Sequence, residues 1–431
     1  MLIPRPVKLR DESLDVMNFL NEIVMRYPDA ISFAPGRPAD QFCDVAGCQE
    51  ALSRYVASVE TTDQLAPVHI RQKLGQYSKT NGIINQLVCR FLARDEDIQA
   101  EPEAIMITNG LQEAMTILAA ALFDGLRDVL LIADPAYNGM TGIATILGVE
   151  TYAVGAADEG IDLEALLEAI QHIKDQGKTP RALYLVPDFN NPLGTSLPLA
   201  ERQRLLRIAH EENMLIFEDN PYGMLAYDGD SFPTLKALDQ WGVVVYLGTF
   251  SKLLFPGLRV GFMLADQRIA NEDGEAGPYL AQELSKVKSL VSVNTSPVTQ
   301  AIIGGFLLEH DCSLKSSLTE KKRFYRANRD QLFQSLEQHF GSDPVLADRV
   351  SWNYPRGGLF LTVTLPFELT PQLLQQCVQE YHVIVCPLSF FSLLPGRERQ
   401  VRLSFSAVSQ IEIATGVARF HQFVHDTWSH M

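Results

Sequence analysis

Short apolar runs alternate with helical patterns through the middle of this 431-residue chain. Each run is rich in Val, Ile and Leu, and apolar positions at helical spacing precede or follow it. Strands buried on both faces of a mostly parallel sheet have this near-continuous apolar character, because helices cover both faces. The pattern predicts an α/β fold with strands at residues 104–108, 129–133, 183–187, 214–218 and 243–248.

A helix is expected directly after the first run. Leu111, Met115, Leu118 and Leu122 recur at helical spacing, so the chain passes from strand to helix through Thr108-Asn109-Gly110. The unpaired N–H groups and the dipole at the start of such a helix favour an anion. A plain strand-to-helix turn would also contain glycine, so the anion site is one of two interpretations.

The pattern changes after about Cys312. A charged helix (TEKKRFYRANRDQLFQSL), short strands around residues 358–365 and 401–405, and a final helix follow. This mixture indicates a second, smaller α+β domain.

Domain limits follow from this distribution of elements. The acidic, glycine-bearing segment 269–278 is expected to be a surface loop before a helix that begins near Tyr279. It lies inside the first, larger unit. We predict an N-terminal arm with part of the small domain at residues 1–60, a large domain at 61–310 and the small C-terminal domain at 311–431.

Composition narrows the class of partner. Acidic residues outnumber basic ones by 52 to 36, and the formal net charge of −16 has the wrong sign for neutralising nucleic-acid phosphates. Six scattered cysteines without a CxxC pair form neither a disulfide framework nor a zinc motif, which indicates a reducing compartment. The start, MLIPRPVKLRDE, lacks the apolar segment of a signal peptide, and no apolar run approaches the ~20 residues that cross a bilayer. We expect a cytoplasmic protein with no metal, nucleic-acid or membrane partner.

The segment GTFSKLLFPGLRVG, residues 248–261, places two hydroxyls, one lysine and one arginine just beyond a predicted buried strand. Lys252 could form a Schiff base in a partly desolvated site there. Thr249, Ser251 and Arg259 could bind a phosphate as hydrogen-bond donors. A single lysine is more often an exposed loop residue, so the interpretation depends on the other strand ends.

Those strand ends carry complementary groups. Asp219 ends a neighbouring run, at the edge where open α/β sheets bind ligands, and a buried carboxylate can keep a heteroaromatic ring nitrogen protonated. Tyr222 and Asn191 could bind a phenolic oxygen, and Tyr137 could stack on a planar ring. Taken singly, these residues also fit a helix cap, Asn-Pro turns and simple packing. Together with Lys252 and the phosphate donors they form the set that pyridoxal phosphate requires.

The order and spacing of these residues resemble the fold-type I, class I/II aminotransferases. Asn191 and Asp219 are 28 residues apart, Asp219 and Lys252 are 33 apart, and Lys252 and Arg259 are 7 apart, as is typical of that family. The segments SFAPGRP, LGQYSKTNG, DPAYNG, GTFSKLLFPGLRVG and GGLF most resemble the aminoadipate and kynurenine aminotransferase branch. The resemblance implies a large, mostly parallel-sheet domain that binds pyridoxal 5'-phosphate, a smaller α+β domain, and a homodimer with shared active sites.

The resemblance also implies roles for individual residues. Lys252, Asp219 and Tyr222 would be catalytic, with Lys252 bound covalently to the cofactor and Asp219 to the ring nitrogen. Asn191 and Tyr222 would bind the ring hydroxyl. Arg402 in VRLSF would clamp the substrate α-carboxylate, a task that suits its planar fork better than a lysine. The other implied positions are the ring-stacking Tyr137, a phosphate site of Gly110, Leu111, Gln112, Thr249, Ser251, Arg259 and Tyr77 of the partner subunit, and the substrate-pocket residues Asn191, Gly36 and Phe360.

The implied activity is transamination, in which an L-α-amino acid passes its amino group to a 2-oxo acid by a ping-pong aldimine/ketimine mechanism. Enzymes of specialised metabolism divert the same quinonoid to cyclisation, elimination or oxidation, and their motifs would look alike. Arg37, the NNPLG loop and the LLFPG segment also depart from the commonest wording of the family. A cofactor-sensing transcriptional regulator is a third interpretation, but it needs a DNA-binding domain, and only about thirty residues precede SFAPGRP.

Overall fold

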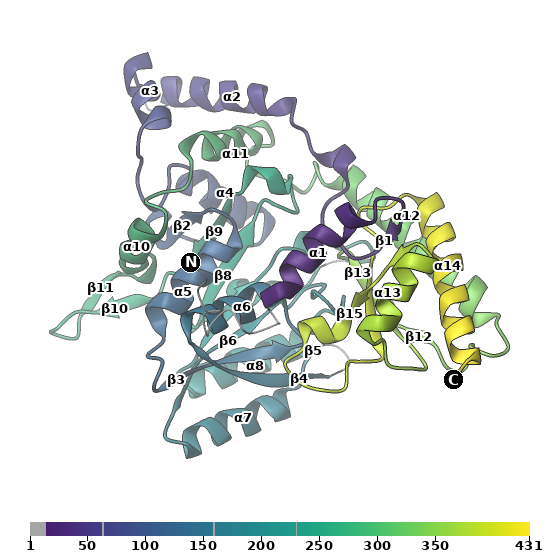
Figure 1. Cartoon of the computed structure of the whole chain (residues 1–431). Coiled ribbons are helices and arrows are strands. Elements are labelled where there is room, and N and C mark those ends of the chain that lie inside the picture. The colour runs from purple at the N-terminus through teal and green to yellow at the C-terminus, as the bar shows by residue number, and fades with distance from the viewer. Residues whose placement is uncertain (1–13, 63, 158–159, 230) are drawn as a thin grey trace, which may run out of the picture.

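A computed structural model describes residues 14–62, 64–157, 160–229 and 231–431 (Figure 1). Its largest element is an eight-stranded sheet in the order β2-β9-β8-β7-β6-β3-β4-β5. Neighbours from β8 to β4 pair in parallel, whereas β9 runs antiparallel between β2 and β8, and β5 runs antiparallel to β4. The strands are β2 (Ile105–Thr108), β3 (Asp128–Asp134), β4 (Glu150–Ala157), β5 (Gly160–Ile161), β6 (Thr179–Leu185), β7 (Leu215–Asp219), β8 (Val244–Thr249) and β9 (Gly261–Leu264).

The five apolar runs of the sequence form β2, β3, β6, β7 and β8, so the predicted α/β fold with a mostly parallel sheet is confirmed. Successive side chains of each strand enter different cores, as the strand period of two requires. Leu130 and Ile132 of β3 pack in the core that contains α5 and α6, whereas Val129 and Leu131 pack in the core of α7 and α8. These helices are α5 (Leu111–Leu122), α6 (Asn138–Leu147), α7 (Leu163–Asp175) and α8 (Leu199–Glu211), and the short α9 (Leu235–Leu238) precedes β8.

A four-stranded antiparallel sheet forms the centre of the C-terminal part, in the order β12-β13-β16-β15. Its strands are β12 (Ser351–Trp352), β13 (Phe360–Thr364), β15 (Cys386–Pro387) and β16 (Gln400–Ser404). The surrounding helices are α12 (Thr319–Leu336), α13 (Pro371–Glu380) and α14 (Gln410–Ser429), which lie together in green and yellow in Figure 1. The predicted charged helix, the two strands and the final helix are therefore present.

The N-terminal segment contacts both parts of the chain. β1 (Ile31–Ser32) pairs in parallel with β14 (Val383–Ile384), beside the small sheet. In contrast, α2 (Gly47–Thr62) packs on α11 (Pro297–Glu309), and the approach is close enough that a Cβ at Gly305 would lie 1.8 Å from the carbonyl oxygen of Ala51. The boundaries at residues 60 and 310 stay a prediction. Three further helices near the N-terminus are α1 (Asp15–Arg26), α3 (Pro67–Gly75) and α4 (Asn85–Asp95), and α10 (Leu280–Val291) precedes α11.

Segment 269–278 differs from its prediction. Instead of an irregular loop, most of it forms a hairpin in which β10 (Arg268–Ala270) pairs with β11 (Ala276–Tyr279). Gly274, with φ +82°, supplies the left-handed residue of the turn, and the Arg268 guanidinium lies 3.5 Å from the centre of the Tyr279 ring. Neither strand has a buried face, so the alternation of apolar and polar residues that identifies strands is missing. Over the part of the chain that the structure describes, no helix is both long and apolar enough to cross a membrane.

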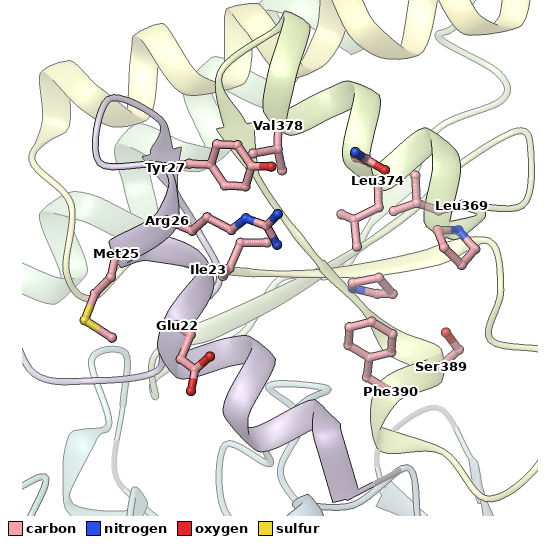
Figure 2. Close-up of a pocket in the computed structure, with 13 residues that line it drawn as sticks. Glu22, Ile23, Met25, Arg26, Tyr27, Leu369, Leu374, Val378, Ser389 and Phe390 are labelled. Carbon is pink, nitrogen blue, oxygen red and sulfur yellow. The ribbon is translucent and has the colours of Figure 1, made fainter. Parts of the chain in front are cut away.

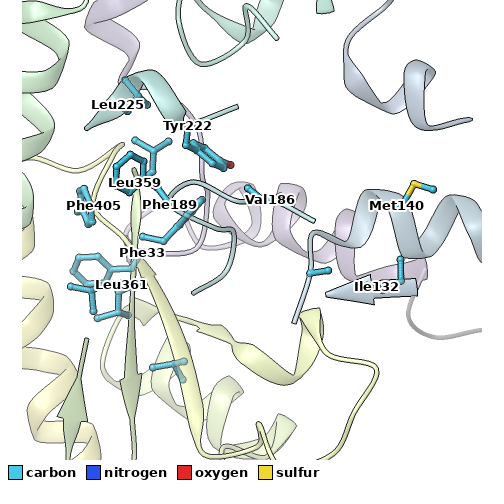
Figure 3. Close-up of a cluster of buried hydrophobic side chains, with 14 of the residues drawn as sticks. Phe33, Ile132, Met140, Val186, Phe189, Tyr222, Leu225, Leu359, Leu361 and Phe405 are labelled. Atoms are coloured by element: carbon cyan, nitrogen blue, oxygen red, sulfur yellow. The ribbon is translucent and has the colours of Figure 1, made fainter. Parts of the chain in front are cut away.

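One hydrophobic core connects the two sheets. In Figure 3, Ile132 and Met140 lie at one end of this cluster and Phe33, Leu361 and Phe405 at the other, with Val186, Phe189 and Tyr222 between them. Close-packed cores transmit displacements rather than absorb them. The small sheet and the carboxyl ends of the large sheet are therefore held in a defined relation, with Tyr222 in the core that joins them.

Candidate active site

Most of the predicted site residues line one pocket of about 500 Å³. Strands β3, β6, β7 and β8 are parallel, so the residues that follow them lie at the same edge of the sheet, where open α/β sheets bind ligands. The small sheet contributes the opposite wall through β16. The pocket lining includes Gly36, Leu111, Gln112, Tyr137, Asn191, Asp219, Tyr222, Thr249, Ser251, Lys252, Arg259 and Arg402.

Lys252 lies in the turn after β8 and is half-buried in the wall of this pocket. Its Nζ donates a hydrogen bond to the carbonyl oxygen of Gly36, at 2.8 Å. Burial, together with the nearby positive charges of Arg402 and Arg259, lowers the pKa of Lys252 to about 8 against the opposing effect of Asp219. A substantial neutral fraction is therefore available near neutral pH, as a nucleophilic or proton-accepting amine requires.

Asp219 ends β7, and its two carboxylate oxygens have different surroundings. Oδ2 accepts a hydrogen bond from the hydroxyl of Tyr184, at 2.6 Å, whereas Oδ1 is buried and has no partner among the described residues. Burial raises the pKa of Asp219 to about 7, against the opposing effects of Tyr184 and Lys252. A buried carboxylate oxygen without a partner is costly unless a ligand donates to it.

Tyr184 lies on β6 and was not identified from the sequence. It is fully buried within an apolar run, where its ring is typical of a strand. A phenol in a strand covered on both faces needs a hydrogen-bond partner, and this is the signal that could have pointed to it.

Asn191 and Tyr222 lie together on the neighbouring wall. The side chain of Asn191 accepts a hydrogen bond from Nη1 of Arg402, at 2.6 Å, and hydrogen-bonds the Tyr222 hydroxyl. Burial and the charge of Asp219 raise the pKa of Tyr222 well above its usual value, so its hydroxyl keeps its proton. The amide and the phenol can therefore both donate to a ligand oxygen.

The start of α5 and Arg259 form the positively polarised corner of the pocket. Gly110 is the N-cap of α5 with φ +77°, and a Cβ at this position would lie 2.5 Å from Nη2 of Arg259. The positive φ favours glycine here, and the absence of a Cβ lets the Arg259 guanidinium lie beside the start of α5. Ser251 and Thr249 follow on the adjacent strand end, and the combination of helix dipole, hydroxyls and arginine is suited to a phosphate.

Tyr137 follows β3, and its hydroxyl accepts a hydrogen bond from Nε2 of Gln112, at 3.3 Å. This contact connects the predicted stacking ring to the first turn of α5. The ring is part of the pocket wall, and its stacking role stays a prediction.

Arg402 on β16 is only 2% exposed and is held on three sides. Its Nη1 donates to Asn191 and its Nη2 to the carbonyl oxygen of Ala34, while its guanidinium carbon lies 4.5 Å from the ring centre of Phe360 and 4.6 Å from that of Phe391. Nε is buried without a partner among the described residues. An arginine fixed in this way with a free donor is prepared to bind a carboxylate.

Gly36 and Phe360 depend on each other. A Cβ at Gly36 would lie 2.4 Å from Cζ of Phe360, so the ring of Phe360 occupies the space that a side chain at position 36 would need. Phe360 lies behind the pocket wall beside Arg402, and Gly36 forms part of the wall itself. Phe391 of η8 (Leu388–Phe391) also lines the pocket and was not identified, because an aromatic pair in an apolar segment indicates only packing.

Tyr77 is not part of this pocket. It follows α3 and is 83% exposed. Its predicted contact with the phosphate of a partner subunit stays a prediction.

A larger hollow of about 990 Å³ lies elsewhere, between α1 and α13. In Figure 2, Glu22, Ile23 and Arg26 of α1 lie on one side of this hollow and Leu374, Val378 and Phe390 on the other. None of the predicted site residues lines it, and its lining has no lysine. η8 separates the two spaces, since Phe390 faces the larger hollow and Phe391 the site of the candidate chemistry.

Comparison with known proteins is consistent with this arrangement. The sequence matches the family "Aminotransferase class I and II" over residues 54–420. It is 39% identical to the (S)-3,5-dihydroxyphenylglycine transaminase of Amycolatopsis orientalis over 411 residues, which are 95% of this chain and 91% of the relative.

Two solved structures agree over nearly their full lengths. The multiple substrate aminotransferase of Thermococcus profundus has a TM-score of 0.82 at 26% identity and covers 99% of this chain and 98% of its own. The α-aminoadipate aminotransferase LysN of Thermus thermophilus, solved with N-(5'-phosphopyridoxyl)-L-leucine, has a TM-score of 0.78 at 28% identity, with 96% of each chain covered.

The residues that line the pocket fit pyridoxal phosphate independently of these comparisons. Asp219 Oδ1 is a buried acceptor without a partner among the described residues, a Cβ at Gly110 would occupy the space beside the Arg259 guanidinium, and Lys252 supplies a half-buried amine with a lowered pKa. The chain therefore belongs to the class I and II aminotransferases, close to the aminoadipate and kynurenine aminotransferase branch, and is a pyridoxal phosphate-dependent transaminase that transfers amino groups between amino acids and 2-oxo acids.

Proposed function

We propose that Lys252 is the residue that binds the cofactor and that Asp219, Tyr222, Asn191 and Arg402 act around it in the transfer of an amino group from an L-α-amino acid. The observation that carries this proposal is the convergence of a half-buried amine, a carboxylate with one unpartnered oxygen and an arginine with one unpartnered donor in a single pocket. When bound, pyridoxal phosphate supplies an electron-withdrawing ring that makes the substrate Cα–H bond acidic.

Lys252 moves the proton. Its amine would accept the proton from the substrate Cα and would donate it again at C4' of the cofactor, because a neutral amine whose pKa is near the working pH is effective in both directions. The carbonyl oxygen of Gly36, 2.8 Å from Nζ, holds the resulting ammonium in the pocket.

Asp219 holds a proton at the ring nitrogen through Oδ1. As a carboxylate it favours the protonated ring, and the hydrogen bond from Tyr184 to Oδ2 favours that carboxylate form. Asn191 and Tyr222 donate to the ring oxygen and keep the ring from rotating.

Arg402 binds and orients the substrate. Nε and the guanidinium edge bind the α-carboxylate, which directs the Cα–H bond toward Lys252. The rings of Phe360 and Phe391, 4.5 and 4.6 Å from the guanidinium carbon, help to exclude water from it.

The quaternary structure and compartment belong to the same proposal. We infer a homodimer in which the exposed Tyr77 contacts the phosphate in the partner subunit. A 3.3 Å hydrogen bond from Asn294 to Ser78 brings the Tyr77 loop beside the end of α10, where Leu290 is 90% exposed. Exposed apolar side chains of this kind favour burial against a second protein surface. All six cysteines are unpaired, which supports a reducing, cytoplasmic location.

Borohydride reduction of the yellow holoenzyme tests the cofactor site. Reduction fixes the cofactor on its lysine, and we expect peptide mapping to find the label on Lys252. A label on Lys288 or Lys321 instead, or no bound pyridoxal phosphate in a protein with Lys252 intact, would contradict the assignment.

Product analysis tests the reaction. We expect purified protein with a panel of amino acids and 2-oxoglutarate or pyruvate to form one new amino acid per oxo acid formed, equally with and without oxygen. Oxygen consumption, or a cyclised or eliminated product in place of the oxo acid, would instead support the diverted chemistry of specialised metabolism.

A further inference from the structure

One face of α12 contacts three separate segments around the active site. Lys321, Tyr325 and Asn328 are spaced four and three residues apart, so they lie on the same side of the helix. Lys321 contacts the turn after β8, the Tyr325 hydroxyl accepts a hydrogen bond from the Ala39 N–H at 3.2 Å, and Asn328 Nδ2 donates to the carbonyl oxygen of Phe405 at 2.9 Å. α12 is therefore a common support for the lysine turn, the segment after Gly36 and the end of β16.

Lys321 makes the most unusual of these contacts. Its Nζ lies 2.7 Å from the carbonyl oxygen of Leu253, 2.9 Å from that of Leu254 and 3.4 Å from that of Lys252. Three donors on one ammonium meet three consecutive acceptors, so its hydrogen-bonding capacity is used within a single turn. The side chain is only 5% exposed, and Nζ lies 5.6 Å from the ring centre of Phe42.

Packing alone does not explain this charge. Among the described residues no carboxylate lies within salt-bridge distance of Lys321, and burial lowers the pKa of its ammonium to about 8. A buried ammonium without an anion is costly, whereas a methionine would fill a similar volume without that cost. The carbonyl dipoles of the turn after β8 offset the cost of burying the Lys321 ammonium. We therefore read the contact with this turn as the role of the charge.

The same helix also holds the other end of the contact that Lys252 makes. Lys252 Nζ donates to Gly36, and the chain after Gly36 is fixed by Tyr325 at Ala39 and by η3 (Asp40–Phe42). The ring of Phe42 packs edge-on against those of Phe324 and Tyr325, at 5.4 and 5.8 Å. Both the backbone that carries Lys252 and the acceptor of its amine are thus positioned by one helix.

We propose that Lys321 is a positioning residue for the transamination site: by binding the three carbonyls of the turn after β8, it fixes the direction in which the Lys252 side chain enters the pocket relative to the segment that contains Gly36. The inference rests on the proposed role of Lys252. Lys321 does not line the pocket and acts only through the turn.

Replacing Lys321 in the holoenzyme tests this role. Lys321→Met keeps the length of the side chain and removes all three donors, Lys321→Gln keeps two neutral donors, and Lys322→Met is the matched control on the next, half-buried position of α12. We expect kcat of Lys321→Met to fall about tenfold to a hundredfold, because small misplacements of a reacting group have effects of this size. KM for the amino acid should stay within about threefold, and Lys321→Gln should lose less, since the Arg402 clamp is untouched.

Two measurements separate positioning from loss of structure. In the cofactor-free protein, amide hydrogen exchange in residues 250–259 should be faster in Lys321→Met than in Lys322→Met, with the rest of the chain unchanged. In the holoenzyme, the pH at which the absorbance of the lysine-bound cofactor changes should shift in Lys321→Met and not in the control.

The test uses whichever of the two Lys321 variants has the melting temperature of the wild type. If the kcat of that variant were within about twofold of the kcat of Lys322→Met, the proposal would be overturned. A rise in KM as large as the fall in kcat would also overturn the proposal. Borohydride labelling of the wild type distinguishes the two levels: absence of the label from Lys252 overturns the proposed function, whereas a normal label with an unaffected Lys321 variant overturns only the role of Lys321.

Discussion

Removal of the Tyr184 hydroxyl tests how the site controls the proton on the cofactor ring. Tyr184→Phe keeps the buried ring and deletes only the donor 2.6 Å from Asp219 Oδ2. The donor favours the carboxylate form of Asp219, so its loss raises the pKa of that group above its present value of about 7. The carboxylate fraction at neutral pH falls as a result.

The size of the effect follows from the geometry. A short, buried hydrogen bond to a charged group contributes about 1.5–3 kcal/mol, and about 1.4 kcal/mol corresponds to a tenfold change in an equilibrium. We therefore expect ionisation of Asp219 to weaken about tenfold to a hundredfold. The ring nitrogen then loses its proton at a lower pH, and kcat falls because the ring withdraws electrons less effectively.

Nitrogen-15 NMR of labelled pyridoxal phosphate in the holoenzyme measures this directly, since the ring nitrogen shift reports its protonation as pH rises. Tyr55→Phe is the matched control, because it deletes a similarly buried hydroxyl that donates to Ile83 O, away from the pocket. If the nitrogen of Tyr184→Phe titrated as in the wild type, or if both variants lost the same kcat, the reasoning about Asp219 would be refuted.

Two further substitutions test the substrate clamp and the subunit contact. Arg402→Lys keeps the charge and loses the planar fork, so kcat/KM for an α-amino acid should fall about tenfold to a hundredfold while bound cofactor and its absorption survive. An equal loss with an amine that lacks the α-carboxylate, or loss of pyridoxal phosphate, would remove Arg402 from this role. Tyr77→Phe and Lys252→Ala homodimers should each be impaired, whereas mixed dimers should regain up to one intact site. An active monomer in sedimentation, or verified hybrids without recovery, would exclude a shared site.

Sequence patterns predicted the parts of the molecule whose signals are local. Buried strands can be recognised in the sequence as apolar runs. Polar residues directly after several such runs must meet at one edge of a parallel sheet. For this reason the sequence could group Lys252, Asp219, Asn191 and Arg259 as candidates, and the structure places all four in the lining of one pocket. The resemblance to a family added Arg402 and Gly36, which lie on other parts of the chain.

Contacts that cross elements were not predictable in the same way. Tyr184 was hidden because a tyrosine suits a strand, and only the register of β6 against β7 places its hydroxyl at Asp219. The contact of Phe391 with Arg402 and that of Lys321 with Leu253 each join residues more than ten positions apart in the sequence. The β10–β11 hairpin was missed because its strands bury no face. The domain boundaries and the role of Tyr77 stay predictions.

The antiparallel β9 restricts how this enzyme can change in length. Because β9 starts at the edge where β8 ends, Lys252 and Arg259 share one short connection, and the separation between amine and phosphate anchor is set by the residues between them. One inserted residue can displace the chain by about 3.3–3.6 Å, whereas catalytic groups tolerate only about 0.5 Å. Exposed connections usually accept insertions and deletions freely during divergence. In this chain we expect insertions and deletions to accumulate at places like the tip of the β10–β11 hairpin. We expect selection to remove them between Thr249 and Gly261, where the length of the connection sets the distance between the two cofactor-binding groups.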